Sequence, residues 1–83
     1  MKEENIFKNI VELLKKDFPL LCLNKDFTIN TNLISDLGFD SISIMQLIIK
    51  LETIFEIEFD DEFFDSNNFC LENIVKFIGN KNG

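Results

Sequence analysis

The stretch DLGFDSI (residues 36–42) joins a long turn-rich segment to the clearest helix of the chain. Its glycine, Gly38, permits a tight turn immediately before a helix. Asp40 predicts an N-cap, because a side-chain oxygen at that position accepts a hydrogen bond from an early helical N–H. Ser41 then falls in the first helical turn, with its hydroxyl exposed where the chain leaves the loop. The stretch therefore predicts both where the helix begins and which side chain its end presents.

The residues that follow predict an amphipathic helix over 41–55. One face of this helix carries apolar side chains at spacings of three and four residues, within an arc of about 100°. These side chains are Ile44, Leu47, Ile48, Leu51 and Phe55.

A second apolar stripe on the same helix, formed by Ile42, Met45 and Ile49, is centred about 130–140° from the first. One helix of a small bundle does not readily bury both faces. Either the long preceding loop covers the second stripe, or this face meets a partner or a group attached to Ser41.

The chain before this stretch predicts one helix and a long connection. Apolar residues recur at helical spacing from Ile6 to Leu14, which predicts an amphipathic helix over 3–17. Phe18-Pro19 should end it, because the residue before a proline is pushed out of the α region. Residues 18–40 combine turn formers with many apolar side chains. A connection of this length is uncommon, so we expect it to pack over the core.

The chain after the central helix predicts two more helical segments. Residues 60–65 are mostly acidic and favour a short helical turn, and apolar spacing from Leu71 to Ile78 predicts a last helix. Gly79 is expected to stop that helix, leaving a frayed tail. Three main helices and a short third helix, with no strand pattern, predict an all-α four-helix bundle. We expect it to form one domain over residues 1–83.

Composition excludes several functions. The chain has 83 residues, no histidine and a formal net charge of −7. The lack of histidine removes Ser–His and Cys–His nucleophilic catalysis and the usual zinc ligand. The acidic balance disfavours nucleic acid and anionic membranes, which attract basic surfaces. The acidic residues 60–65 lack the alternating pattern and glycine of a calcium-binding EF-hand loop, so no metal site is expected.

The sequence also predicts the compartment. No apolar run approaches the roughly 18 residues of a membrane helix, and the start MKEE does not resemble a signal peptide. Cys22 and Cys70 lie outside any CxxC pattern, and we expect two buried thiols rather than a disulfide. These features predict a cytoplasmic protein that does not insert into membranes.

Ser41 is the residue best placed to carry chemistry. The N–H groups and dipole at a helix N-terminus favour a negative group such as a phosphodiester. Ser41 is therefore suited to esterification by a phosphate-linked group, and poorly suited to catalysis, because no histidine base is present. The alternative is that Asp40-Ser41 is only a capping pair.

The stretch 36–42 and the residues after it resemble the acyl carrier protein family. That family shows D-L-G-x-D-S-L, an amphipathic helix and an acidic I-x-I-P-D-E-like stretch. Here DLGFDSI is followed by MQL (45–47) and FEIEFDDE (55–62), and the resemblance spans essentially the whole chain. It implies a four-helix bundle with a short third helix. It also implies a non-catalytic carrier that holds acyl or aminoacyl groups as thioesters on 4′-phosphopantetheine. Ser41 would be the attachment residue, and Asp40 would assist the attachment.

The resemblance also implies partners. A phosphopantetheinyl transferase would load the carrier from coenzyme A, and an acyl- or aminoacyl-loading enzyme and downstream biosynthetic enzymes would follow. The carrier is expected to be a monomer, and the helix over 41–55 would be its recognition helix. The expected partner-binding residues are Phe39, Ile42, Met45, Ile49, Glu52 and Glu56.

The pathway stays open at this point. Carriers of fatty acid synthesis commonly have acidic residues where this helix has Ser43, Gln46 and Thr53. A freestanding carrier in fatty-acid, polyketide-like or other specialised biosynthesis is expected. The alternatives are a peptidyl carrier of a nonribosomal-peptide-like pathway and, in another class, an acidic helical interaction module without a prosthetic group. Residues 51–75 carry a charge of −8 with no basic residue, which favours a directional surface for basic partner patches.

Overall fold

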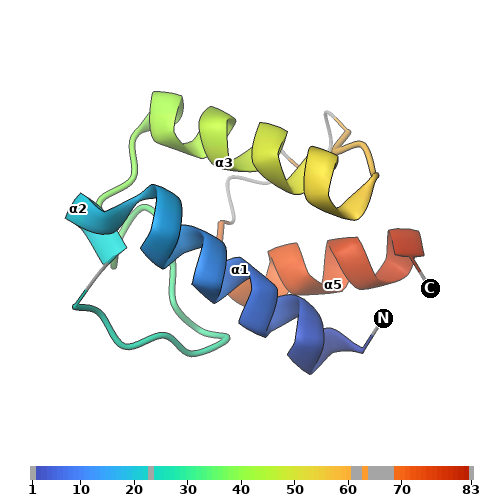
Figure 1. The fold of residues 1–83 in the computed structure, drawn as a ribbon, viewed down its shortest axis with the longest axis horizontal. Helices are drawn as coiled ribbons and strands as arrows, with labels where there is room; N and C mark the ends of the chain where they lie inside the picture. Colours follow the sequence, from blue (N-terminus) through green and yellow to red (C-terminus); the bar gives the residue numbers. More distant parts are fainter. Residues whose placement is uncertain (1, 23, 61–62, 64–68, 83) are drawn as a thin grey trace.

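The computed structural model describes residues 2–22, 24–60, 63 and 69–82. Its helices are α1 (Glu3–Asp17), α2 (Pro19–Cys22), α3 (Ser41–Phe55) and α5 (Leu71–Asn82). Figure 1 shows α1 beside α5 and α3 across the top of both, with the start of α3 opposite the two termini. The described residues contain no strand beyond one isolated bridge between Asn32 and Cys70. The expected all-α bundle is confirmed.

The first helix has the predicted limits and is followed by a short helix that the sequence pattern did not indicate. The N–H of Phe18 donates to the carbonyl of Leu14 (2.9 Å) and closes α1. Pro19 then starts α2, a position that suits proline because the first helical N–H has no partner within the helix. Four residues are too few to show a helical period, which explains why α2 was not predicted.

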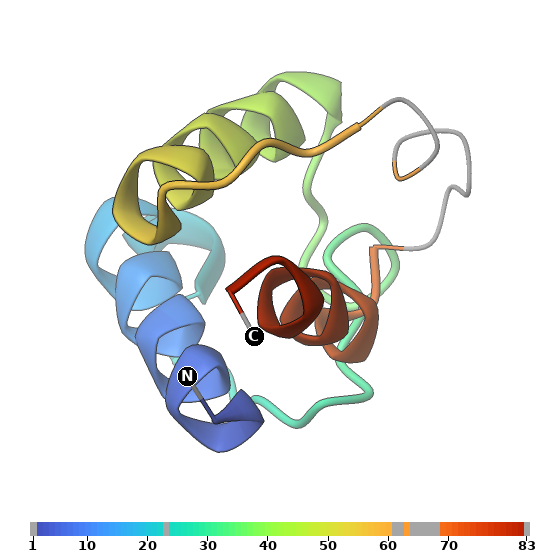
Figure 2. The same cartoon turned by 90° about the vertical axis from the view of Figure 1, so that its right-hand side faces the viewer.

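The central helix α3 has the predicted bounds. Its first turn is capped by Asp40, whose Oδ1 accepts from Ser43 N (2.8 Å). At the other end Glu56 adopts a left-handed conformation (φ 55°), and its N–H donates to the carbonyl of Glu52. This residue turns the chain back along α3 (Figure 2).

The prediction that Gly79 stops the last helix is wrong. The helix α5 continues through Gly79 to Asn82, and the described part of the expected frayed tail is helical. An added Cβ at Gly79 would lie 3.7 Å from Glu3 Cγ and from Ile6 Cδ1, so this position faces α1. The glycine therefore lies where α5 crosses α1 closely, rather than in a left-handed turn.

Each of the three long helices contributes fully buried side chains to one core, and the loop before α3 adds more. Figure 2 shows α1 and α3 on one side of α5 and this loop on the other. The expectation that the loop packs over the core is confirmed. The fully buried residues are Ile6, Ile10, Leu14, Cys22, Leu33, Leu47, Ile48, Leu51, Leu71, Ile74 and Ile78.

Phenylalanine rings close the core beyond the end of α3. The ring of Phe59 stacks on Phe77 of α5 at 4.6 Å between centroids, and the ring of Phe63 contacts both. The expected acidic turn over 60–65 lies mostly outside the described residues. Within the part of the chain that the structure describes, no helix is long and apolar enough to cross a membrane.

Gly38 and Gly79 should respond oppositely to alanine. Gly79→Ala should raise the free energy of unfolding by about 0.4–1 kcal/mol, because the site is helical and the new methyl meets only ordinary contacts. Gly38→Ala should lower it by about 1–2 kcal/mol, because Gly38 has φ 77°. Urea denaturation of both variants checks this contrast. A destabilised Gly79→Ala protein would contradict the helical assignment at that position.

Candidate functional site

The loop that leads to Ser41 is tied to the start of α5. Three main-chain hydrogen bonds make this connection between segments about 40 positions apart in the chain. They run from Leu33 N to Phe69 O (3.0 Å), from Leu71 N to Thr31 O (2.9 Å) and from Glu72 N to Ile29 O (2.8 Å). The last helix therefore helps to fix the position of the loop before α3.

A compact turn over 32–38 carries the chain from this anchor towards α3. The side-chain oxygen of Asn32 accepts from Ile34 N and Ser35 N (2.9 and 3.0 Å). Asp36 Oδ2 accepts from Asn32 N (2.8 Å) and closes the turn from the other side. The roles of Asn32 and Asp36 were not predicted from the sequence. The spacing of four residues between an Asn and an Asp in a turn-rich segment is the signal that could have indicated them.

Phe39 belongs to the core and not to the partner surface where it was expected. Its side chain is buried, and its ring lies 5.1 Å from that of Phe18 at the end of α1. Its N–H donates to the carbonyl of Leu33 (2.9 Å). An aromatic residue next to the start of a helix can face inward or outward, and its neighbours in sequence do not decide which.

Ser41 is exposed at the first position of α3, as expected. Asp40 is exposed beside it. The hydrogen bonds from the Ser43 backbone N–H, and then from its side chain, hold the pKa of the Asp40 carboxyl below its usual value. A hollow of about 480 Å³ opens next to these two residues. Its lining includes the apolar side chains of Ile44, Met45 and Phe69. The site therefore combines an exposed hydroxyl, a charged carboxylate and an apolar wall.

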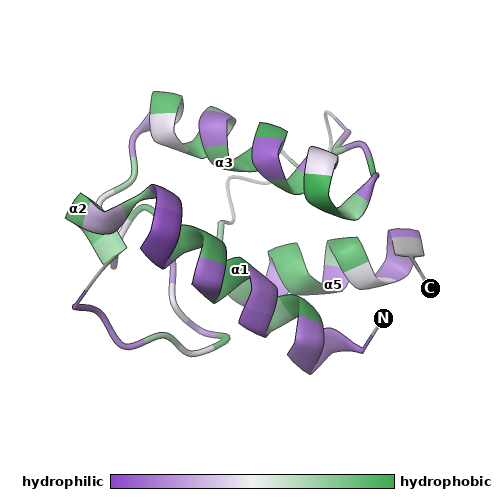
Figure 3. Cartoon of the chain, viewed as in Figure 1, coloured by the Kyte–Doolittle hydropathy of each residue, from purple (hydrophilic) through white to green (hydrophobic). Residues whose placement is uncertain are grey.

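The second apolar stripe of α3 lies on the surface. Ile42 is 70% exposed, Met45 48% and Ile49 56%. The loop before α3 does not bury these side chains, so the interpretation that it covers the stripe is wrong. Figure 3 shows hydrophobic residues along the whole length of α3. The stripe is free to meet another molecule.

The two glutamates expected on the partner face differ in their surroundings. Glu52 is half-buried, and its Oε2 accepts from Phe59 N (2.9 Å), so its carboxylate holds the returning chain. Glu56 is exposed at the end of α3. Glu56 is therefore the more accessible of these two glutamates.

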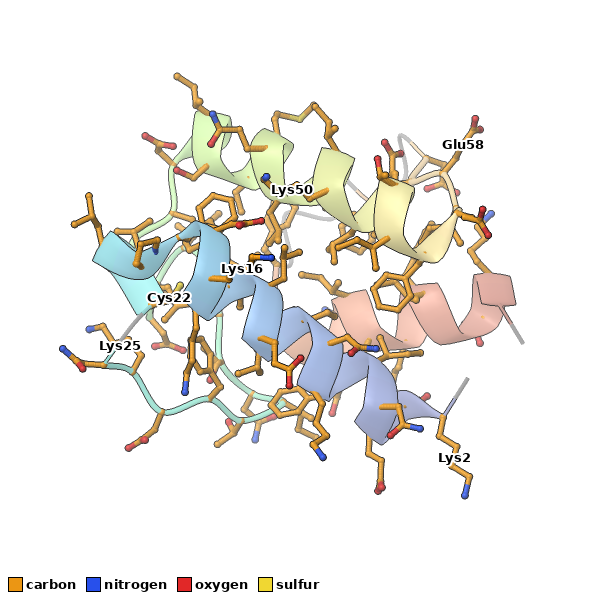
Figure 4. The ribbon with its side chains drawn as sticks, in the orientation of Figure 1. Lys2, Lys16, Cys22, Lys25, Lys50 and Glu58 are labelled. Carbon is orange, nitrogen blue, oxygen red and sulfur yellow. The ribbon has the colours of Figure 1, made fainter. Side chains whose placement is uncertain are left out.

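Neither cysteine is part of a disulfide. Cys22 is buried at the end of α2, and burial raises the pKa of its thiol, while the nearby charge of Lys25 lowers it to a lesser extent (Figure 4). Cys70 is half-buried, less than expected, and its Sγ donates to the carbonyl of Ile29 (3.0 Å). Across the described residues, no group of three acidic, cysteine or histidine side chains could hold a metal ion.

Comparison with known proteins places this chain within a family. Residues 10–78 match the family of the phosphopantetheine attachment site. The acyl carrier protein of Buchnera aphidicola subsp. Acyrthosiphon pisum (strain 5A) is 39% identical over 77 residues, which cover 90% of this chain and 95% of that relative. The acyl carrier protein of Lactobacillus acidophilus is 40% identical over 63 residues, which cover 75% of each chain. That of Coprothermobacter proteolyticus is 31% identical over 62 residues, which cover 75% of this chain and 73% of the relative.

The cap at Asp40 predicts a pH dependence. Because its folded-state pKa lies below the usual value near 3.8, the charged form stabilises the fold above that pH. This contribution should disappear as the pH falls through the lowered pKa. Asp40→Asn keeps an acceptor oxygen but cannot titrate. Urea denaturation should therefore show the wild type losing stability relative to Asp40→Asn as the pH falls below about 3.8. A difference that stays constant with pH would contradict the assignment.

Proposed function

Because the chain belongs to the acyl carrier protein family, whose members carry covalent 4′-phosphopantetheine, we propose that Ser41 is the residue that carries it. Acyl carrier proteins are non-catalytic, and they act with a phosphopantetheinyl transferase and biosynthetic enzymes. The observation that carries the proposal is the exposed Ser41 hydroxyl in the first turn of α3, directly after a capping aspartate. We also propose that the chain acts as one monomeric carrier domain.

The residues around Ser41 fit this group. The N-terminal N–H groups and the dipole of α3 favour a phosphodiester at this position. The neighbouring hollow leaves room for the start of the arm, and its apolar wall suits the methyl and methylene groups that follow the phosphate. When attached, phosphopantetheine supplies a terminal thiol that holds an acyl group as a thioester. The chain's own contribution is to present the hydroxyl and leave the surface around it open.

Asp40 is proposed to assist the attachment. Its carboxylate is exposed, lies next to Ser41 and is charged at neutral pH, as an aspartate is when its pKa is at or below the ordinary value. One of its oxygens accepts from Ser43 N, which holds the side chain beside the first turn of α3. A fixed negative charge at this point suits a reaction in which a transferase uses magnesium and coenzyme A.

The cargo is proposed to be an acyl group in fatty-acid or polyketide-like biosynthesis. This choice over an aminoacyl cargo is supported by the relatives, which are named acyl carrier proteins and match up to 95% of their own length. The turn before Ser41 reads Leu-Gly-Phe-Asp, which also differs from the Gly-Gly-Asp of a typical peptidyl carrier.

Ser41→Ala should abolish loading by a phosphopantetheinyl transferase with coenzyme A and Mg²⁺. The matched control is Ser35→Ala, which removes another exposed serine hydroxyl from the loop before α3. Intact mass spectrometry should show the mass of one phosphopantetheine added to the wild type and to Ser35→Ala only. Thermal unfolding of all three proteins should be closely similar, since both serines are exposed. Loading of Ser41→Ala would contradict the assignment.

Cargo class is checked on the phosphopantetheine-loaded protein. We expect it to accept a malonyl or fatty acyl group from an acyltransferase or an acyl-carrier synthetase. We expect no transfer of an aminoacyl group from an adenylation enzyme under the same conditions. Mass spectrometry distinguishes the thioesters. Aminoacyl transfer without acyl transfer would favour a peptidyl carrier instead.

A further inference from the structure

We propose that the groove between α1 and residues 25–29 binds an amphipathic helix of a partner protein, with acidic side chains at one end of that helix and basic side chains at the other. The groove lies away from Ser41, so such a partner can hold the carrier while Ser41 serves other enzymes. The role of Ser41 in this statement rests on the proposed function, whereas the binding of the helix does not.

Two neighbouring hollows form the groove. They have volumes of about 320 and 270 Å³, and Phe7 of α1 lines both, so they lie next to each other along this helix. At the larger hollow Lys15 reaches from α1 to the loop, and its Nζ lies 5.7 Å from the centre of the Phe27 ring. A cation at this distance from an aromatic face is attracted to it. This contact holds the Lys15 ammonium group at the hollow.

The floor of the groove is apolar. The larger hollow is lined by Phe7, Val11 and Phe27, which are all half-buried. The smaller hollow is lined by Phe7 again, by Val75 of α5 and by Ile29, which is 46% exposed. Apolar side chains that share a hollow and are rimmed by charges are the kind of surface that protein partners bury.

The larger hollow is the basic end of the groove. Lys8, Lys15 and Lys25 line it together with Glu12 and Asp26, so the lysines outnumber the acids. Among the residues that the structure describes, none of the three lysines forms an ion pair. All three are exposed. Their charges are therefore available to acidic side chains of a partner.

The smaller hollow is the acidic end of the groove. Glu3 and Glu4 in the first turn of α1 line it, as does Glu72 in the first turn of α5. Lys76 lines it too, but its Nζ lies 3.6 Å from Glu72 Oε1, so these two charges balance each other. The exposed carboxylates of Glu3 and Glu4 leave an excess of negative charge. This end suits basic side chains of a partner.

The two ends are as far apart as a short helix is long. Between Glu4 and Lys15, α1 rises about 17 Å at about 1.5 Å per residue. An amphipathic helix carries apolar side chains two turns apart on one face, about 11 Å from each other, so one can enter each hollow. Charge complementarity then sets its direction, with its acids at the lysines and its bases at the glutamates. A nucleic acid or an anionic lipid surface carries a single sign of charge and fits the groove less well.

The groove and Ser41 lie on different faces of the molecule. The described residues that line the two hollows include none from α3 and none from the hollow next to Ser41. Figures 1 and 2 show α3 along the top of the molecule and residues 24–29 lower down. A partner helix bound in the groove therefore leaves the start of α3 open.

The test uses two synthetic helical peptides of about 14 residues and equal composition. Both carry two leucines two turns apart on one face. The probe has its acids at one end and its bases at the other, whereas the control has them evenly mixed. Titration of the isotope-labelled protein at about 20 mM NaCl should shift the amide signals of residues that line the groove. The probe should bind with Kd below about 1 mM, and the control at least about fivefold more weakly.

One pair of variants tests the basic end. Lys15→Gln with Lys25→Gln should raise the Kd of the probe about 3- to 10-fold at about 20 mM NaCl and much less at about 300 mM. The matched control is Lys2→Gln with Lys16→Gln, which removes two exposed lysines that line neither hollow. This control should stay within about twofold of the wild type.

A second pair tests the apolar floor. Ile29→Ser should raise the Kd of the probe about 2- to 5-fold at both salt concentrations, because an apolar contact does not depend on screening. Its control is Ile54→Ser, which changes a comparably exposed isoleucine (53%) near the end of α3. Thermal unfolding shows that each variant is folded.

The outcomes separate the groove from the proposed function. The inference is overturned if the probe does not bind at about 5 mM, if both peptides bind equally, or if the shifts fall on α3. Larger shifts at Lys15 and Lys25 with phosphatidylglycerol vesicles than with the probe would overturn it in favour of a lipid surface. Loading of Ser41 should proceed unchanged with the probe bound, and a block would contradict the separation of the two faces. If Ser41 is not loaded even without the probe, the proposed function fails and the groove stands.

Discussion

The position of Ser41 depends on three main-chain hydrogen bonds that join the loop over 29–33 to the start of α5. The loop between α2 and α3 has no regular element of its own, so its N–H and C=O groups need partners elsewhere. The start of α5 supplies them, and the buried side chain of Leu33 adds an apolar anchor. The turn over 32–38 and the cap at Asp40 connect this anchored loop to the first turn of α3, so they fix where Ser41 lies. The residue that presents the hydroxyl is therefore held by the opposite end of the chain.

The sequence predicted the parts of the fold that follow from periodic spacing of apolar residues or from local capping chemistry. The limits of α1 and α3 follow from apolar residues at helical spacing, and the cap at Asp40 follows from local chemistry. It did not predict what depends on distant neighbours. Phe39 faces inward because Phe18 lies beside it, and Gly79 stays helical because α5 crosses α1 there. The loop is bonded to the start of α5 by main-chain hydrogen bonds, and the pattern of side chains in the sequence does not predict such bonds.

For the candidate site, too, the sequence predicted the local features but not those that depend on distant packing. Ser41 and Asp40 could be placed from seven consecutive residues. Periodicity showed that Ile42, Met45 and Ile49 share a face, but only the packing of the loop decided that this face is exposed. The charge of −8 over residues 51–75 was visible in the sequence. Its separation from Ser41 along the helix was visible there too, and the structure adds that the Glu52 carboxylate accepts a hydrogen bond from Phe59 N. Ser41 therefore lies beside the capping Asp40, at the opposite end of α3 from most of this charge.

The central claim is that this chain carries phosphopantetheine on Ser41. The most direct measurement is tandem mass spectrometry of peptides from the protein isolated from its own cells, without added transferase. The account predicts the phosphopantetheine group on the peptide that contains residues 36–42, with fragment ions assigning it to Ser41. A chain that is never modified in those cells, or a group found on any other residue, would contradict it.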